Sequence, residues 1–240
     1  MGTCAVIPKI IHQTWKTRSL PGLMRPLTEK WKQLHPLWEY RLWTDIANRE
    51  FIHDHFPEFL NKYDGYPYAI QRVDAIRYLL LYRYGGVYVD LDFECLKNIE
   101  PLIEGATCLL GREAEEQCQR NEKDEIIGNA FIACTPGHPF IKAICDAVCG
   151  DGRIATDNTH VLDTTGPFML TRVYEQFAQK DSIRVLDADV LYPLGTEDHG
   201  PVRVRKATDP EMTGKLGNAY AVHHYWGSWW KVENVKTESI

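Results

Sequence analysis

The segment from Ala69 to Asp92 constrains the fold of this 240-residue chain most strongly, because a helical pattern ends in it at a Gly-Gly pair and a strand pattern begins. Before the glycines, apolar residues recur at spacings of three and four, as on one buried helical face: Ile70, Val73, Ile76, Leu80 and Tyr84. After them, apolar residues alternate with polar ones, as on a strand with one apolar face: Val87, Tyr88, Val89, Asp90, Leu91 and Asp92. The sequence predicts a helix over 69–84, a turn at Gly85 and Gly86, and a strand that runs into two acids.

Asp90 and Asp92 form a candidate metal site. On a strand their side chains share one face and their Cα atoms lie roughly 6.5 to 7 Å apart, so both carboxylates can turn toward one divalent cation. Carboxylate oxygens are hard ligands that suit Mn²⁺ or Mg²⁺, and a nucleotide diphosphate can supply further oxygens. The competing interpretation is a pair of solvated acids. Asp187 and Asp189 have the same spacing in different surroundings, an apolar run over 183–191, and serve as an internal control.

Asp74 and Arg77 lie off the apolar stripe of the predicted helix, three residues apart, so they are neighbours on its surface. A carboxylate beside a planar cation with five donors can bind the hydroxyls of a sugar. An ordinary surface ion pair explains the same two residues without any function.

Two motifs in this region resemble the signature of glycosyltransferase family 32: Asp74-Ala75-Ile76-Arg77-Tyr78, and the stretch from Tyr84 to Asp92. The resemblance covers most of the chain. Residues 7–16 are similar to the family's first strand, 42–45 to its second and 224–229 to its closing motif. The family includes yeast-type and inositol phosphoceramide mannosyltransferases, bacterial capsule enzymes and, distantly, the clostridial glucosylating toxins.

The resemblance implies a single GT-A domain over residues 1–240, and the alternation of predicted strands and helices independently favours an α/β fold with a mostly parallel sheet. It implies a retaining, Mn²⁺- or Mg²⁺-dependent enzyme that moves a hexose, with mannose favoured, from GDP-mannose or a UDP-hexose to a glycan or glycolipid acceptor as an α-glycoside. The alternatives are a UDP-hexose transferase (galactose, glucose or GlcNAc) and a catalytically silent module that binds sugar nucleotides. A nucleotidyltransferase is disfavoured because no Gly-rich phosphate loop is present near the N-terminus.

The resemblance also implies residue roles. Asp92 is the expected main metal ligand, and Asp90 supports the metal or binds the ribose. Tyr88, Asp74 and Arg77 hold the donor sugar. Trp15 stacks on the nucleobase, although the residues alone fit a core tryptophan equally well. Asn129 and Thr165 lie on the acceptor side, where a turn asparagine and helix capping are simpler explanations.

The last part of the chain is expected to complete the site. Residues 219–223 predict a strand that ends in two histidines, and the following segment, 225–230, is too aromatic for a free tail. Because neighbouring strand residues point to opposite faces, only one histidine can meet Asp92. His224 is expected to be the third metal ligand, and Ser228 and Trp229 to contact the donor and exclude water. A purely structural role for both histidines remains the alternative.

Charge and cysteine content limit the partners and the compartment. The net charge of −6, with acids and bases interspersed, argues against nucleic-acid binding. No apolar run approaches a membrane span, and the N-terminus lacks signal-peptide features, although peripheral membrane association stays open. Seven cysteines without a C-x-x-C pair favour free thiols in a reducing compartment. We therefore expect the protein in the cytoplasm, either free or at the inner face of a membrane. The alternative is the Golgi lumen, if an N-terminal anchor precedes this sequence.

Overall fold

The computed structural model describes residues 6–195 and 210–227, with side chains from Thr213 in the second range. Its centre is a six-stranded sheet of order β2-β1-β3-β6-β5-β7. The strands are β1 (Ile10–Thr14), β2 (Glu39–Trp43), β3 (Gly86–Val89), β5 (Cys108–Arg112), β6 (Ile127–Cys134) and β7 (Arg184–Leu186). The β2–β1, β1–β3 and β5–β7 pairs are parallel, and β6 runs antiparallel to β3 and β5. The predicted α/β, mostly parallel GT-A architecture is confirmed.

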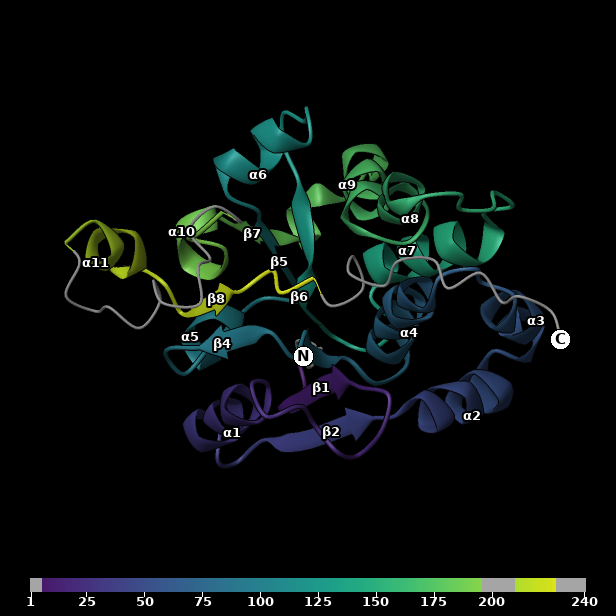
Figure 1. Cartoon of the computed structure of the whole chain (residues 1–240), viewed down its shortest axis with the longest axis horizontal. Coiled ribbons are helices and arrows are strands. Elements are labelled where there is room, and N and C mark those ends of the chain that lie inside the picture. The colour runs from purple at the N-terminus through teal and green to yellow at the C-terminus, as the bar shows by residue number, and fades with distance from the viewer. Residues whose placement is uncertain (1–5, 196–209, 228–240) are drawn as a thin grey trace, which may run out of the picture.

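Helices surround this sheet, and β1 and β2 lie at the bottom of Figure 1 with α6, α8 and α9 at the top. The helices are α1 (Arg25–Leu34), α2 (Asp45–His55), α3 (Leu60–Asp64), α4 (Ala69–Tyr84), α5 (Glu100–Ile103), α6 (Glu115–Arg120), α7 (Pro139–Gly150), α8 (Asn158–Thr164), α9 (Pro167–Gln176), α10 (Ala188–Leu191) and α11 (Pro210–Leu216), with short 3₁₀ turns at Pro57–Phe59 and Lys180–Ser182. A second, two-stranded sheet pairs β4 (Phe93–Cys95) with β8 (Ala221–His223). Within the described ranges no helix has the length and apolar character needed to cross a bilayer.

Both faces of the central sheet carry a hydrophobic core. On β3, Tyr88 packs into the core that contains α4, α7 and α9, whereas Val87 and Val89 pack into the core that contains α1 and α5. All four residues of β3 are buried. The prediction of one apolar and one polar strand face is therefore wrong for β3 itself. Asp90 and Asp92 lie beyond its end, in a turn where the Phe93 amide donates to the Asp90 carbonyl at 3.1 Å.

The Gly-Gly turn joins α4 to β3 as predicted, and only glycine fits there. Gly85 and Gly86 have φ values of 62° and 91°, in the left-handed region that L side chains rarely adopt. A Cβ on Gly85 would lie 2.7 Å from Pro136, and one on Gly86 would lie 2.7 Å from the Ile10 carbonyl oxygen. Helix α4 keeps its predicted bounds, but its middle is buried on all sides, including Asp74 and Arg77. The surface-pair interpretation of these two residues is therefore wrong.

Two further segments bear on the cavity and on the control pair. The charged segment 113–125 contains α6, and its first residue, Glu113, is buried. The apolar run 183–191 is divided between β7 and α10, with Asp187 at the start of α10. The control pair lies in that junction: the Asp187 side chain is 87% exposed, and Asp189 accepts a hydrogen bond from Asn218.

Candidate active site

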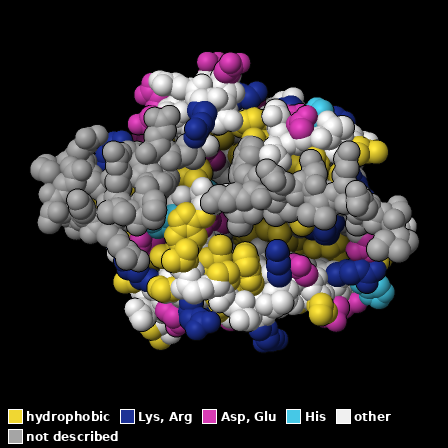
Figure 2. All heavy atoms as spheres, viewed as in Figure 1, with side chains coloured by type: hydrophobic (Ala, Val, Ile, Leu, Met, Phe, Trp, Pro, Cys, Tyr) yellow, Lys and Arg dark blue, Asp and Glu magenta, His cyan; other side chains and the backbone are white. Residues whose placement is uncertain are grey.

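A cavity of about 1260 Å³ opens where β1 and β3 end, which is where α/β sheets bind their ligands. Figure 2 views the molecule from the side on which hydrophobic side chains gather between its upper and lower halves. The predicted site residues that line this cavity are Trp15, Asp74, Arg77, Asp90, Asp92 and Asn129. His223, Tyr225 and Trp226 from the end of the described chain also line it. Segments far apart in the sequence therefore meet at one place, as the resemblance implied.

Asp90, Asp92 and His223 form a group that can hold a metal ion. One ligand atom from each residue lies within 4.8 Å of the others, and the His223 Nε2 atom lies 3.3 Å from Asp92 Oδ1. The His223 Nδ1 atom is buried and makes no hydrogen bond. Two carboxylates with one imidazole form a donor set that suits Mn²⁺ and accommodates Mg²⁺ less well. The residues present therefore fit the metal that the family implies.

The prediction of His224 as the third ligand is corrected by the structure. His223 pairs with Phe93 in the β4–β8 ladder, and its ring stacks on Phe93 beside Asp92. The His224 ring turns to the other face, where its Nε2 atom lies 3.1 Å from Glu94 Oε2. The rule that neighbouring strand residues point to opposite faces holds, but the sequence does not reveal which face meets Asp92. The backbone of His224 still contributes, because its amide donates to the Asp92 carbonyl at 2.9 Å.

The chain after β8 fixes the Asp92 carboxylate. Tyr225 has a φ of 47°, which is uncommon for a residue other than glycine, and the chain turns back there toward the cavity. The Trp226 amide then donates to Asp92 Oδ2 at 2.9 Å. Ser228 and Trp229, the predicted donor-binding residues of this segment, lie outside the described residues.

Asp74, Arg77 and Asp90 form a buried charged network behind the metal group. The Arg77 guanidinium contacts Asp74 Oδ1 at 3.0 Å and Asp90 Oδ2 at 3.3 Å, and donates to the Asn129 carbonyl at 2.7 Å. Asp74 accepts further bonds from Asn129 Nδ2 and Thr165 Oγ1, each at 3.0 Å. Arg77 thus connects α4 to the end of β3, and the network couples the predicted sugar-binding residues to the predicted metal-binding residues.

Of three predicted contact residues, Tyr88 and Thr165 do not line the cavity, and Asn129 lines it with its amide nitrogen already bonded. Tyr88 is fully buried: its hydroxyl donates to Asp90 Oδ1 at 2.8 Å and accepts from Thr14 Oγ1 at 3.0 Å, so it supports Asp90 and does not reach a sugar. Thr165 is 1% exposed and holds Asp74. Asn129 lines the cavity, but its amide nitrogen is bonded to Asp74 and Tyr78. Period-2 alternation and capping rules cannot separate such supporting residues from contact residues.

Burial and neighbouring charges set the protonation of the acids. Burial raises the pKa of Asp90 above its usual value, although Arg77 opposes the shift. Burial acts in the same sense on Asp92, but the His223 imidazole and the Trp226 amide outweigh it, so the pKa of Asp92 lies below its usual value. Burial raises the pKa of Asp74 to about 6, against the charge of Arg77. Asp92 and Asp74 are therefore ionised at neutral pH.

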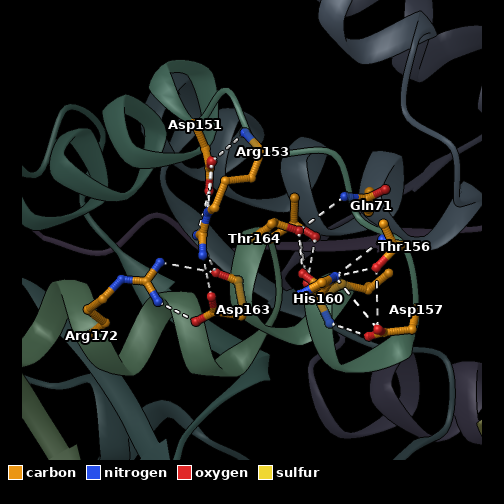
Figure 3. A network of polar contacts seen from close by, with 11 residues as sticks. Gln71, Asp151, Arg153, Thr156, Asp157, His160, Asp163, Thr164 and Arg172 are labelled. Atoms are coloured by element: carbon orange, nitrogen blue, oxygen red, sulfur yellow. Dashed lines mark hydrogen bonds and ion pairs between the residues drawn. The ribbon is translucent and has the colours of Figure 1, made fainter.

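Helix α8 places Thr165 against Asp74, and a polar network holds this helix (Figure 3). Arg153 bridges Asp151 and Asp163, and Arg172 contacts the other oxygen of Asp163. On the side facing α4, the Gln71 amide donates to Thr164 Oγ1 at 3.1 Å. The network ties the segment before α8 to α9.

Two buried polar residues of the cavity, Asn48 and Glu113, were not singled out from the sequence. Asn48 on α2 is 1% exposed, and its Oδ1 atom is buried without a hydrogen-bond partner. Glu113 directly follows β5, and burial raises its pKa to about 7. The apolar run that forms β5 ends just before Glu113, and this was the signal that could have identified the residue, because ligands gather at strand ends.

Comparison with known proteins agrees with this geometry. Residues 21–109 match the family described as "Glycosyltransferase sugar-binding region containing DXD motif". Inositol phosphoceramide mannosyltransferase 3 of Schizosaccharomyces pombe is 39% identical over 71% of this chain, which spans only 45% of that relative. An uncharacterized glycosyltransferase of Acanthamoeba polyphaga mimivirus is 35% identical over 93% of this chain and 84% of its own length. Lactosylceramide 4-alpha-galactosyltransferase of Rattus norvegicus is 29% identical over 62% of this chain and 39% of its own length.

Among solved structures, the PaToxG glycosyltransferase has a TM-score of 0.52 with this chain, at 19% identity, over 72% of this chain and 71% of its own. That likeness concerns the fold. The relatives and the family match concern the sequence, and the matched range of residues 21–109 contains the acidic pair of the metal group. The chain therefore belongs to the glycosyltransferase family whose sugar-binding region contains the DXD motif.

Proposed function

We propose that this chain is a retaining, metal-dependent hexosyltransferase that moves mannose from a nucleotide sugar to a glycan or glycolipid acceptor as an α-glycoside. The observation that carries the proposal is the convergence of Asp90, Asp92 and His223 at a large cavity. The charged network of Asp74 and Arg77 lies directly behind that group. The names of the fungal relatives favour mannose as the sugar and a glycolipid as the acceptor.

Each part of the donor has a matching part of the cavity. Trp15 is half-buried on the cavity wall just after β1, where it can stack on a nucleobase. Asp90, Asp92 and His223 would hold the metal, whose charge stabilises the diphosphate as the bond from the anomeric carbon to its oxygen breaks. Asp74 faces the cavity as an ionised acceptor for sugar hydroxyls, and Arg77 keeps it in place.

A donor screen tests the proposal. GDP-mannose, UDP-galactose, UDP-glucose and UDP-GlcNAc are each added with Mn²⁺, and thermal unfolding and slow hydrolysis of the sugar nucleotide are measured. With all four donors at the same concentration, GDP-mannose is expected to raise the unfolding temperature most. At 100 times its dissociation constant it should add about 2.7 kcal/mol to the free energy of unfolding. Failure of all four donors to stabilise the protein or to be hydrolysed would refute the proposal.

UDP-galactose is the second candidate donor, because one relative is named as an α-galactosyltransferase. The same screen separates the two donors by the size of the shift. A catalytically silent module would bind a donor without hydrolysing it. The configuration of the transferred sugar, read from the anomeric proton by NMR, tests retention separately.

A further inference from the structure

Glu113 is a buried acid in the cavity that the proposed mechanism does not use. It directly follows β5, and its backbone amide donates to the Ile126 carbonyl at 2.9 Å, which fixes the residue at the end of the strand. The residue is 9% exposed, and it lines the same cavity as Asp90 and Asp92. The neighbouring exposed acids of α6, Glu115 and Glu116, do not line this cavity.

Among the residues that the structure describes, none forms a hydrogen bond or an ion pair with the Glu113 carboxyl. Within that part of the chain, His223 is the charged group that acts on it, and it lowers the pKa of Glu113 against the effect of burial. Arg112, the adjacent cation, is directed to Glu125 and Asp187 instead. A buried carboxylate that lacks partners is costly, and such groups are hydrogen-bonded in most proteins. The carboxyl of Glu113 is therefore a hydrogen-bonding group that the folded chain leaves available to a ligand.

The position of Glu113 indicates which ligand. In the sheet order, β1 and β5 lie on opposite sides of β3 and β6, and the metal group follows β3. A donor whose base stacks on Trp15 and whose diphosphate meets the metal group occupies the β1 side of the cavity. Glu113 lies on the β5 side, within electrostatic reach of His223 at the edge of the metal group, and Tyr225 also lines the cavity. This side is left for the second substrate.

We propose that Glu113 is an acceptor-binding residue, whose carboxylate accepts hydrogen bonds from hydroxyl groups of a sugar or cyclitol ring in the acceptor. Two carboxylate oxygens match two neighbouring hydroxyls on such a ring. The bound hydroxyls are ones that do not react, so Glu113 orients the acceptor and makes or breaks no covalent bond. The inference rests on the proposed function, because it needs a hydroxylated acceptor.

The test compares Glu113→Gln with Glu115→Gln, the same change two residues away on an exposed side chain. With Mn²⁺ and the donor that the wild type hydrolyses fastest, transfer to water is measured alone and then with methyl α-mannoside or myo-inositol. For Glu113→Gln, the KM of the acceptor is expected to rise about tenfold or more, because a buried hydrogen bond to a charged group is lost. Hydrolysis and the donor KM stay within about twofold of the wild type, and Glu115→Gln changes none of these values.

A series of monodeoxy acceptors identifies the contact. Removal of the hydroxyl that Glu113 binds should raise the acceptor KM of the wild type. It should raise the KM of Glu113→Gln little further, because the variant has already lost the other partner of that hydrogen bond. Thermal unfolding gives a readout apart from activity. Glu113→Gln is expected to melt at the wild-type temperature or above, because it replaces a buried carboxyl that has no hydrogen-bond partner among the described residues with a neutral amide.

Several outcomes would overturn the inference. An unchanged acceptor KM in Glu113→Gln, additive losses at every deoxy position, or a parallel loss of hydrolysis and Mn²⁺ dependence would each do so. A lower melting temperature would assign Glu113 a structural role instead. If the wild type hydrolyses a donor but transfers sugar to neither methyl α-mannoside nor myo-inositol, the proposed class of acceptor is wrong. A wild type that neither binds nor hydrolyses any donor rejects the proposed function itself.

Discussion

Asp92 joins the segment after β3 to the end of the described chain. Its carboxylate contacts His223 at the end of β8 and accepts a hydrogen bond from the Trp226 amide. We expect Asp92→Asn to reduce metal-dependent transfer at least about 100-fold, because the charge that binds the cation is lost. Asp187→Asn is the matched control, since that exposed carboxylate lies at the start of α10. Initial rates at saturating donor measure both. Equal losses in the two variants would contradict the assignment.

The two histidines at the end of β8 give a second residue-scale prediction. His223→Ala should raise the Mn²⁺ concentration for half-maximal activity at least about tenfold, because one of the three proposed metal ligands is removed. His224→Ala removes the contact with Glu94, which is outside the metal group, and should shift that concentration much less. Titration of activity with Mn²⁺ compares them. The reverse order of effects would show that His224 is the ligand.

At the scale of single elements, the residue that ends α8, Thr165, supports Asp74 through one hydroxyl. Thr165→Val keeps the shape but leaves a buried oxygen of Asp74 with one fewer donor, which should cost about 1 to 3 kcal/mol of stability. Arg153→Ala breaks half-exposed ion pairs in the same region and should cost less than about 1 kcal/mol. Urea unfolding measures both. A larger cost for Arg153→Ala would mean that the surface network, and not Thr165, holds α8.

His12 links three strands and gives the whole molecule a pH-dependent stability. The Trp43 indole donates to His12 Nδ1 at 3.0 Å, and His12 Nε2 donates to the Gly85 carbonyl at 3.0 Å, so the ring is neutral in this arrangement. Burial lowers the pKa of His12 to about 4. The unfolded chain, with a pKa of 6.5, therefore binds a proton first as the pH falls. Stability from this residue is complete above pH 6.5 and is lost toward pH 4, by at most about 3 kcal/mol.

Urea unfolding at several pH values between 7.5 and 4.5 measures this loss. His12→Asn keeps a polar side chain without a titrating group in that range, so its stability should depend less on pH than that of the wild type. Other buried histidines, including His35 and His138, whose pKa values burial also lowers, contribute to both slopes equally. Parallel slopes in the two proteins would show that His12 does not titrate this way.

The sequence predicted the parts of the molecule that local rules determine. Helix α4 was predicted from the spacing of its apolar residues, and the turn after it from two consecutive glycines, which the structure finds at left-handed φ values. The site at Asp90 and Asp92 was predicted from their position after an apolar strand. The burial of Asp74 and Arg77, the supporting role of Tyr88 and the choice of His223 over His224 depend on contacts between distant segments. Strand direction is a similar case, because β6 reads as an ordinary apolar strand and yet runs antiparallel to both of its neighbours.

The position of β6 also determines when its neighbouring strands can pair during synthesis of the chain. It separates β3 from β5 in the sheet, although both precede it in the sequence. Before residue 127 has been added to the chain, the edges of β3 and β5 that β6 will join therefore have no partner strand. Unpaired edges of this kind are where nascent chains associate with one another or are captured by chaperones. The eight residues of β6 pair with both of these edges, so we expect the tendency of the growing chain to associate to fall once β6 has been made.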